Sequence, residues 1–247
     1  MRILMINPNM TQSMTDAMAE VALETAGDIA QIIPSTATQG FPYISSRAEA
    51  QIAGAHVLET IAAHQGQVDA VIVAAFGDPG LVAARELFDI PVVGMAEAAV
   101  LMAAMLGERF AVVTFSPHMV RWYQDCVLQT GLGARFTGVR CPENPPESID
   151  NIAIELKGDL IALAGQATAE DGADVIIMGG APLAGLAPKI AHEANGILID
   201  PIAAATAQAI AMLKLSPNLT NRAAPPAAKA STGLSPDLEA IIAGRRL

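Results

Sequence analysis

The segment "DAVIVAAFGDPGL", residues 69–81, has the pattern of a buried strand that ends in a glycine-rich turn. Its β-branched run is typical of a strand covered on both faces. Gly77 and Gly80 allow a sharp turn and a close approach of the backbone to a ligand. Asp78 and Pro79 suit the cap and the first turn of a following helix, whose first amides attract an anion. This unit predicts a parallel α/β sheet with a ligand site at the end of the strand.

The same alternation of β-branched runs and Ala-rich segments continues along the chain. Strands are expected near residues 2–6, 29–33, 69–75, 91–94, 109–114, 134–140, 174–179 and 196–199. Helices are expected near residues 11–26, 46–65, 80–88, 96–107, 117–130, 147–171, 183–194 and 202–214, with a short helix at 237–244. A strand–helix alternation of this kind predicts parallel strands joined by right-handed crossovers.

The chain also contains an internal repeat. "RILMINPN" (2–9) resembles "RFAVVTFS" (109–116), and "AVIVAAFGDPGL" (70–81) resembles "VIIMGGAPLAGL" (175–186). "IPVVGMAEAAVLMAAML" (90–106) resembles "GILIDPIAAATAQAIAML" (196–213) at nearly the same displacement. We therefore expect an α/β fold of two pseudo-symmetric lobes, each a mostly parallel sheet flanked by helices, with the active site between them. Lobe 1 is expected to comprise residues 1–94 and 196–215, lobe 2 residues 95–195, and a C-terminal tail residues 216–247.

Composition narrows the classes of partner. The formal net charge is −11, which argues against nucleic acid because no basic stripe can release counterions. The apolar stretch at residues 91–106 is interrupted by Glu97 and is too short to cross a membrane. Two cysteines and a strand-like opening, "MRILMINPN", favour a reduced cytoplasmic protein. Neither metal-ligand spacing nor a phosphate-binding fingerprint occurs in the sequence, so we expect a small-molecule partner and no cofactor.

Four motifs resemble the aspartate/glutamate/hydantoin racemase superfamily, and within it the hydantoin and allantoin racemase branch. They are "INPN" (6–9), "FGDPGL" (76–81), "ARELFDIPVVGMAEAA" (84–99) and "APLAGLA" (181–187), and the resemblance covers residues 1–214. It implies two similar lobes, an active site between them, cofactor-independent chemistry and a homo-oligomer.

The resemblance also implies a catalytic cysteine before "FGDPG" and another in the matching loop of lobe 2. In that family one thiolate removes the proton alpha to a carbonyl and the other thiol delivers a proton to the opposite face. Here the two positions are Ala75 and Gly180, which cannot exchange a proton. Cys126 and Cys141 match neither position, and we expect both to be buried structural thiols.

Three residues are candidates for the chemistry. Glu97 follows the fourth strand and serves as a base, orients a water or caps its helix. His118 begins a helix near the expected cleft and is either a general acid or base or a surface residue. Thr114 is the lobe 2 counterpart of Asn7 and is either a ligand contact or a cap.

Further residues are expected to contact the substrate. Asn7 can orient a carbonyl or carboxylate, and Arg47 can hold an anionic tail or remain a solvated residue at a helix start. The expected binding set is Asn7, Tyr43, Ser45, Arg47, Ala75, Phe76, Gly77, Ser116, Gly180, Ala181 and Pro182. The alternative is that both glycine-rich loops are ordinary strand-to-helix turns.

The expected function follows from the missing thiol pair. A positioned acid or base contributes about 10²–10⁴-fold to a rate, so losing both should abolish two-base racemisation. The sequence therefore favours water-mediated hydrolysis or desulfurisation of a hydantoin-like substrate (a cyclic ureide or thiohydantoin) or of a carboxylate. Two alternatives stay open: a hydantoin, allantoin or amino-acid racemase or isomerase with substitute acid/base groups, and a non-catalytic binder of small ligands.

Overall fold

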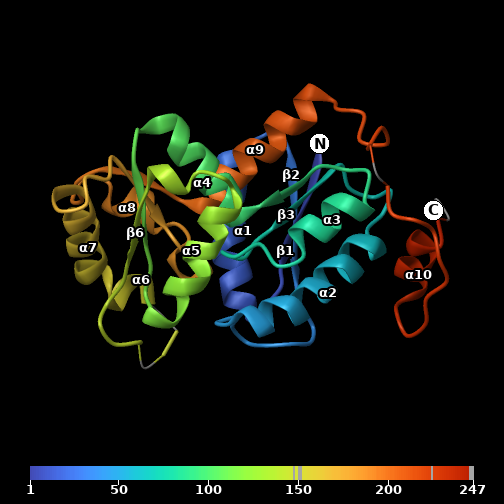
Figure 1. The fold of residues 1–247 in the computed structure, drawn as a ribbon, viewed down its shortest axis with the longest axis horizontal. Coiled ribbons are helices and arrows are strands. Elements are labelled where there is room, and N and C mark those ends of the chain that lie inside the picture. Colours follow the sequence, from blue (N-terminus) through green and yellow to red (C-terminus); the bar gives the residue numbers. More distant parts are fainter. Residues whose placement is uncertain (147, 150–151, 224, 245–247) are drawn as a thin grey trace.

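The computed structural model describes residues 1–146, 148–149, 152–223 and 225–244, which form two four-stranded parallel sheets (Figure 1). The first sheet has the order β2-β1-β3-β4 and contains β1 (Arg2–Asn7), β2 (Gln31–Thr36), β3 (Ala70–Val73) and β4 (Val92–Gly94). The second has the order β6-β5-β7-β8 and contains β5 (Phe110–Val113), β6 (Phe136–Arg140), β7 (Val175–Met178) and β8 (Ile197–Ile199). Each strand thus occupies the same place in its sheet as its repeat partner. The expected α/β fold of two similar lobes is confirmed.

Helices cover both faces of the sheets. They are α1 (Gln12–Ala26), α2 (Arg47–Ala63), α3 (Leu81–Leu87), α4 (Met95–Leu106), α5 (Val120–Gln129), α6 (Ile152–Glu155), α7 (Lys157–Ala169), α8 (Leu186–Ile190), α9 (Pro201–Leu215) and α10 (Pro236–Ile242). Short 3₁₀ turns lie at η1 (Pro117–Met119), η2 (Gly133–Arg135) and η3 (Ala181–Leu183). The helix expected at 147–171 corresponds to α6 and α7, and its expected start at residues 147 and 150–151 lies outside the described residues. The helix expected at 183–194 is divided because Gly185 adopts a left-handed conformation with φ of 76°.

Two helices exchange places between the lobes. Helix α4 follows β4 of the first sheet but packs against β7 and β8 of the second, whereas α9 follows β8 and packs against β3 and β4. Helices α4 and α9 also pack against each other in the middle of the molecule (Figure 1). Alanines such as Ala99, Ala103, Ala205 and Ala209, all fully buried, allow this close approach. The exchange fixes the two sheets relative to one another and thereby the geometry of the space between them.

One part of the expected lobe boundary differs from the observed pairing. We expected residues 196–215 to belong to lobe 1, but β8 pairs in parallel with β7 of the second sheet. This is the same pairing that β4 makes with β3 in the first sheet, so the repeat includes the strand as well as the loop before it. From the range 196–215, only α9 packs on the first sheet.

The C-terminal tail is anchored to lobe 1. Helix α10 packs against α2, and Leu238 is buried in the lobe 1 core cluster that also contains Val57 and Ile61. The Ser235 amide donates a 3.2 Å hydrogen bond to Glu59, and Arg222 forms a 2.5 Å ion pair with Asp89.

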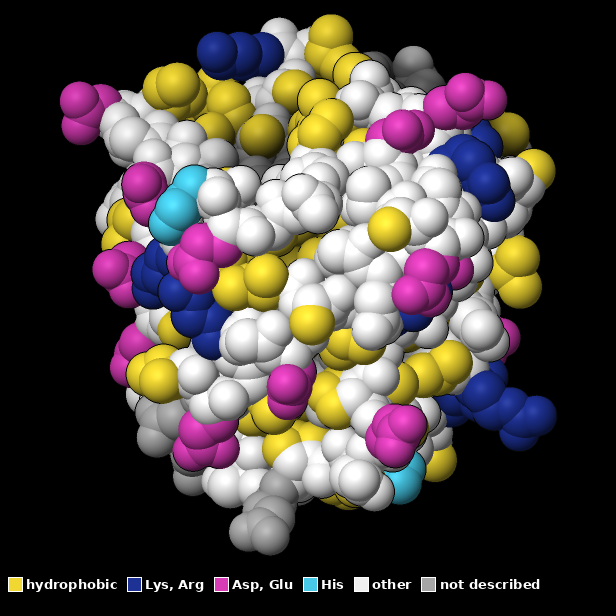
Figure 2. All heavy atoms as spheres, turned by 90° about the vertical axis from the view of Figure 1, so that its left-hand side faces the viewer, with side chains coloured by type: hydrophobic (Ala, Val, Ile, Leu, Met, Phe, Trp, Pro, Cys, Tyr) yellow, Lys and Arg dark blue, Asp and Glu magenta, His cyan; other side chains and the backbone are white. Residues whose placement is uncertain are grey.

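The outer surface of lobe 2 carries a mixture of side chains. Acidic and basic groups are interspersed with hydrophobic ones on this face (Figure 2). In the described part of the chain, no helix combines the length and the apolar character needed to cross a membrane.

Candidate active site

The glycine-rich loops of the two lobes meet at a small cavity, which we call the inter-lobe cavity. Ala75 and Phe76, which follow β3, line it from lobe 1, and Ala181 and Pro182, which follow β7, line it from lobe 2. A Cβ atom placed on the neighbouring Gly180 would lie 2.6 Å from the Phe115 ring and 3.5 Å from the Tyr123 hydroxyl. Both residues contribute to the same cavity wall. The two positions singled out in the sequence, 75 and 180, are therefore brought to one place.

Aromatic rings form most of the remaining wall. The rings of Phe76 and Tyr123 lie 4.5 Å apart between centroids, those of Trp122 and Tyr123 5.8 Å, and those of Tyr43 and Phe115 6.0 Å. The volume left between them is about 20 Å³, which is room for a single water molecule. A ring-shaped ligand is several times larger than that, so its entry requires one of these side chains to move.

A glycine on each loop makes room for one of these rings. Gly77 has φ of 131°, and a Cβ atom there would lie 2.1 Å from the Trp122 ring. Gly180 has φ of 129° and is similarly covered by Phe115. Both glycines combine a backbone conformation that other residues rarely adopt with a contact that leaves no room for a side chain.

A carboxylate fixes each loop to a neighbouring helix start. Asp78 accepts 2.8 Å hydrogen bonds from the amides of Ala96 and Glu97 at the start of α4. We expected Asp78 to cap the helix that follows it directly, and this was wrong: Gly80 occupies the cap position of α3, and no side chain caps that helix. The reason is conformational, because Asp78 has φ of 49° and lies across from α4. Burial raises the pKa of Asp78 to about 7, although the two amides act in the opposite direction.

Asp200 has the corresponding role in lobe 2. Its Oδ1 atom accepts from the amides of Ile202 (2.9 Å) and Ala203 (3.3 Å) at the start of α9. Its Oδ2 atom accepts a 2.6 Å hydrogen bond from the Gly185 amide in the loop after β7. Burial raises the pKa of Asp200 above its ordinary value, against the effect of these amides.

The two charged candidates for the chemistry lie outside the inter-lobe cavity. Glu97 is held by Arg85 through a bidentate ion pair with N–O distances of 3.0 and 2.5 Å, and Arg85 also donates to the Val92 carbonyl. His118 is exposed on η1, where its amide donates to the Ser116 hydroxyl over 3.4 Å. Neither side chain is among the residues that line the cavity.

Thr114 and Ser116 are both buried at the end of β5. Ser116 caps η1 through its hydroxyl. The Thr114 hydroxyl has no hydrogen-bond partner among the described residues. The Tyr123 phenol faces this hydroxyl, but the pair does not reach ordinary hydrogen-bond geometry. A buried hydroxyl without a partner is unusual and costs stability. The Thr114 hydroxyl at the end of β5 is therefore a hydrogen-bonding group that the described residues leave unused.

The expected binding residues of lobe 1 mainly organise their loops. The Asn7 amide donates to Asn9 Oδ1 (3.0 Å) and Thr15 Oγ1 (2.9 Å), so Asn7 shapes the loop while Asn9 lines the cavity. Ser45 donates to Glu49, which forms a capping box with Ser46 at the start of α2. Tyr43 lines the cavity as expected.

Arg47 connects the lobes instead of reaching the inter-lobe cavity. It lies at the start of α2, and its guanidinium bonds to Asp125 and, over 3.1 Å, to the Arg121 carbonyl, both on α5. The side chains of Arg47 and Asp125 are 55% and 44% exposed. Arg47 therefore uses its donors within the protein.

The two phenols of the cavity wall are held in their neutral form. Burial raises the pKa of Tyr43, and the nearby Glu49 carboxylate adds to the effect. Burial raises the pKa of Tyr123 well above its ordinary value, with smaller contributions from Tyr43 and Cys126. At neutral pH both groups are consequently hydrogen-bond donors, supplied by different lobes.

The cysteines do not supply a thiolate to this cavity. Burial, followed by the Asp78 and Asp125 carboxylates, raises the pKa of Cys126 to about 12. Burial also raises the pKa of Cys141. Both thiols are half-buried rather than fully buried as expected, and neither lines the inter-lobe cavity.

We did not predict Phe115, Trp122 or Tyr123 at this site from the sequence. A signal was present in "RWYQ", residues 121–124, which supplies the single tryptophan and one of two tyrosines in a chain that is 4% aromatic. An adjacent aromatic pair near the start of a helix, just after a lobe 2 strand, is a candidate wall for a cleft at that strand end.

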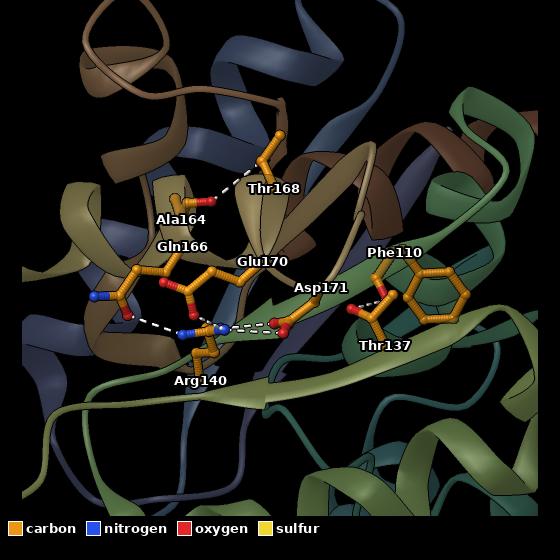
Figure 3. Close-up of polar contacts among 8 residues, drawn as sticks. All are labelled: Phe110, Thr137, Arg140, Ala164, Gln166, Thr168, Glu170 and Asp171. Atoms are coloured by element: carbon orange, nitrogen blue, oxygen red, sulfur yellow. Dashed lines mark hydrogen bonds and ion pairs between the residues drawn. The ribbon is translucent and has the colours of Figure 1, made fainter.

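A larger cavity, about 940 Å³, lies elsewhere, at the end of β6. Its main cation, Arg140, already binds both Asp171 oxygens (2.6 and 2.8 Å), Glu170 (2.7 Å) and Gln166 (2.9 Å), as Figure 3 shows. This hydrogen bonding to Arg140 lowers the pKa of Asp171. The guanidinium is thus committed to fixing β6 against the end of α7. Among the described residues, no group of three His, Cys, Asp or Glu side chains is arranged to hold a metal ion.

Comparisons with known proteins agree with the geometry. The family model described as Asp/Glu/Hydantoin racemase matches residues 3–209. A hydantoin racemase of Paenarthrobacter aurescens is 31% identical over 217 residues, covering 87% of this chain and 92% of that protein. A hydantoin racemase of Pseudomonas sp. (strain NS671) is 34% identical over 213 residues, covering 83% and 82%. The solved structure of an allantoin racemase from Klebsiella pneumoniae superimposes with a TM-score of 0.88 at 30% identity, covering 97% of this chain and 98% of that one.

Proposed function

The chain belongs to the Asp/Glu/hydantoin racemase family, and from that premise we propose that it exchanges the proton on the carbon alpha to a carbonyl of a small hydantoin-like substrate. The observation that carries the proposal is the meeting of the two glycine-rich loops at the inter-lobe cavity. The relatives described above are racemases. They favour the racemase or isomerase alternative over the hydrolysis or desulfurisation expected from the missing thiol pair.

Ala75 and Gly180 contribute space rather than proton transfer in this proposal. We assign the substitute polar groups to the two phenols of the cavity wall, Tyr123 from α5 and Tyr43 from the segment before α2. Tyr123 is the better placed of the two because its hydroxyl lies beside Gly180. Glu97 and His118 are less suitable, since one is neutralised by Arg85 and the other is exposed.

The chemistry of such a site follows from the protonation state of the phenols. Removing the alpha proton places negative charge on the carbonyl oxygen, and a neutral phenol stabilises that oxygen by donating a hydrogen bond. A neutral phenol accepts the alpha proton poorly, so the base is a minor phenolate or hydroxide. Because burial raises the pKa of both tyrosines, the exchange rate is expected to rise with pH up to about pH 10 without a plateau.

Proton exchange in D₂O tests the proposal. Hydantoin, its alkyl- and benzyl-substituted forms, allantoin, aspartate and glutamate are each incubated with the protein, and the alpha-proton signal is followed by NMR. We expect faster loss of that signal with the protein than with buffer for at least one cyclic ureide. Tight binding measured by calorimetry, without exchange of any compound, would instead identify a non-catalytic binder. Neither binding nor exchange would remove the proposal.

A further inference from the structure

A second cavity lies next to the inter-lobe cavity and has no part in the proposal so far. We call it the α2–α5 cavity, because its walls come from α2, the loop at residues 77–80, α3 and α5. Its volume is about 470 Å³, compared with about 20 Å³ for the inter-lobe cavity. The loop after β3 borders both, through Phe76 on one side and Asp78 on the other.

Trp122 is the side chain that separates the two cavities. In the described part of the chain it is the one residue that lines both. Its indole ring lies over Gly77, where a Cβ atom would be only 2.1 Å away. Phe115 and Tyr123 are packed more tightly, with 1% and 3% of their surface exposed, compared with 8% for Trp122. Among the three lobe 2 rings of the wall, Trp122 is therefore the one that has free space to move into.

The charged side chains around the α2–α5 cavity determine whether an anionic or a neutral ligand group fits there. Asp78, Glu86 and Asp125 line it, and among the described residues that line it Arg47 is the one cation. Arg47 is already bound to Asp125 and to the Arg121 carbonyl. An anionic group entering this space would meet carboxylates without a free cation, whereas a neutral group would meet alanine, leucine and valine side chains and the amides of Gln51 and Gln129.

From these observations we infer that the α2–α5 cavity receives the substituent on the ring of the substrate, and that Trp122 is the specificity-determining residue that sets its size. The inference rests on the proposed function, because it assumes a ring bound at the loops after β3 and β7. It adds that the substituent is neutral and bulky, that Trp122 moves aside to admit it, and that carboxylate-bearing rings are rejected.

Calorimetric titration with matched ligands and variants tests this assignment. Wild type, Trp122→Ala and Leu128→Ala are titrated with unsubstituted hydantoin and with benzyl-substituted hydantoin. Removing the indole joins the two cavities, so the affinity for the benzyl compound relative to hydantoin should rise about tenfold or more in Trp122→Ala. The ratio should stay at the wild-type value in Leu128→Ala, whose side chain is 61% exposed on the same helix. Trp122→Phe should give an intermediate ratio and serves if the alanine variant does not fold.

Two readouts on the wild type locate the substituent. Trp122 is the single tryptophan, so its fluorescence emission should shift when the benzyl compound binds. Cys126 lines the α2–α5 cavity, so its alkylation by iodoacetamide should slow with the benzyl compound but not with hydantoin. Cys141, which lies at the end of β6, is the internal control.

The charge argument has its own matched pair of ligands. A carboxymethyl-substituted hydantoin should bind the wild type about tenfold or more weakly than the carbamoylmethyl compound of nearly the same shape. Equal affinity would overturn the assignment of a neutral substituent.

The outcomes separate the two proposals. If hydantoins bind and exchange but the affinity ratio is unchanged in Trp122→Ala and Trp122→Phe, the assignment of the α2–α5 cavity is wrong and the proposed function stands. If no hydantoin binds to the wild type or to any variant, the proposed function fails, and the assignment fails with it.

Discussion

The loops that follow β3 and β7 occupy equivalent places in the two lobes, yet their carboxylates come from different sources. In lobe 1 the carboxylate belongs to the loop itself, where Asp78 caps α4. In lobe 2 it belongs to the next strand end, where Asp200 caps α9 and also holds the loop through the Gly185 amide. Both solutions attach a glycine-rich loop to the first turn of a helix that crosses to the other sheet. The comparison shows that the position of the loop is retained in the repeat while the residue that fixes it has moved.

The polar side chains at the ends of β1 and β5 differ in whether their hydrogen bonds are formed within the protein. Asn7 in lobe 1 uses its side chain in hydrogen bonds to Asn9 and Thr15. Its counterpart Thr114 in lobe 2 is buried without a hydrogen-bond partner among the described residues. All three rings that cover the loop glycines or the Thr114 hydroxyl, Phe115, Trp122 and Tyr123, also come from lobe 2. At these two strand ends, lobe 1 thus uses its polar groups within its own loop, whereas lobe 2 leaves a hydroxyl available to a ligand. Tyr43 is the donor that lobe 1 adds to the cavity wall.

The largest expected effect on stability comes from removing the two carboxylates, Asp200 and Asp78. Asp200→Ala leaves three amides without their acceptor in a buried site, and should lower the free energy of unfolding by about 3–5 kcal/mol. Asp78→Ala leaves two amides in a less buried position and should cost about 1–2 kcal/mol. Urea denaturation followed by circular dichroism measures both. Equal losses would mean that the two carboxylates are equivalent despite their different origins.

Gly180 and Gly77, which lie under aromatic rings, give a second comparison in which the expected losses of stability are smaller. Gly180→Ala forces a strained φ and a contact with Phe115, and should cost about 3 kcal/mol. Gly77→Ala has the same backbone problem, but Trp122 can move into the α2–α5 cavity, so about 1–2 kcal/mol is expected. Thermal unfolding of the wild type and both variants under the same conditions measures the two losses of stability. A larger loss in Gly77→Ala would contradict the mobility that we assign to Trp122.

The pH dependence of the unfolding free energy tests the protonation state of Asp78 in the folded protein. Burial raises its pKa from 3.8 to about 7 in the folded protein, so the folded state binds more protons than the unfolded state between these values. The stabilisation that comes from protonating Asp78 is therefore full below about pH 4 and is lost as the pH rises towards 7, while its hydrogen bonds to the α4 amides are retained. The difference in unfolding free energy between the wild type and Asp78→Asn should change across this range and be flat above it. A difference that is constant with pH would show that the carboxyl is ionised throughout.

Much of the fold was predictable because the repeat has nearly constant spacing. The similarity of the two lobes, the equivalence of the two loops and the proximity of positions 75 and 180 all follow from it, whereas the order of the strands within each sheet was not predicted. The wall of the cavity was not predictable in the same way, because Trp122 and Tyr123 reach it only through the packing of α5 between the lobes. The partners of Glu97 and Arg47 were also hidden, since Arg85 and Asp125 approach them through tertiary packing. Whether the chain forms a homo-oligomer stays a prediction.

The most direct test of the central claim is the rate of alpha-proton exchange on a hydantoin substrate in D₂O, measured for wild type, Tyr123→Phe and Tyr43→Phe. We expect exchange above the buffer rate in the wild type and a loss of about 10²-fold in Tyr123→Phe, with a smaller loss in Tyr43→Phe. Exchange that is unchanged in both variants, or absent from the wild type, would contradict it.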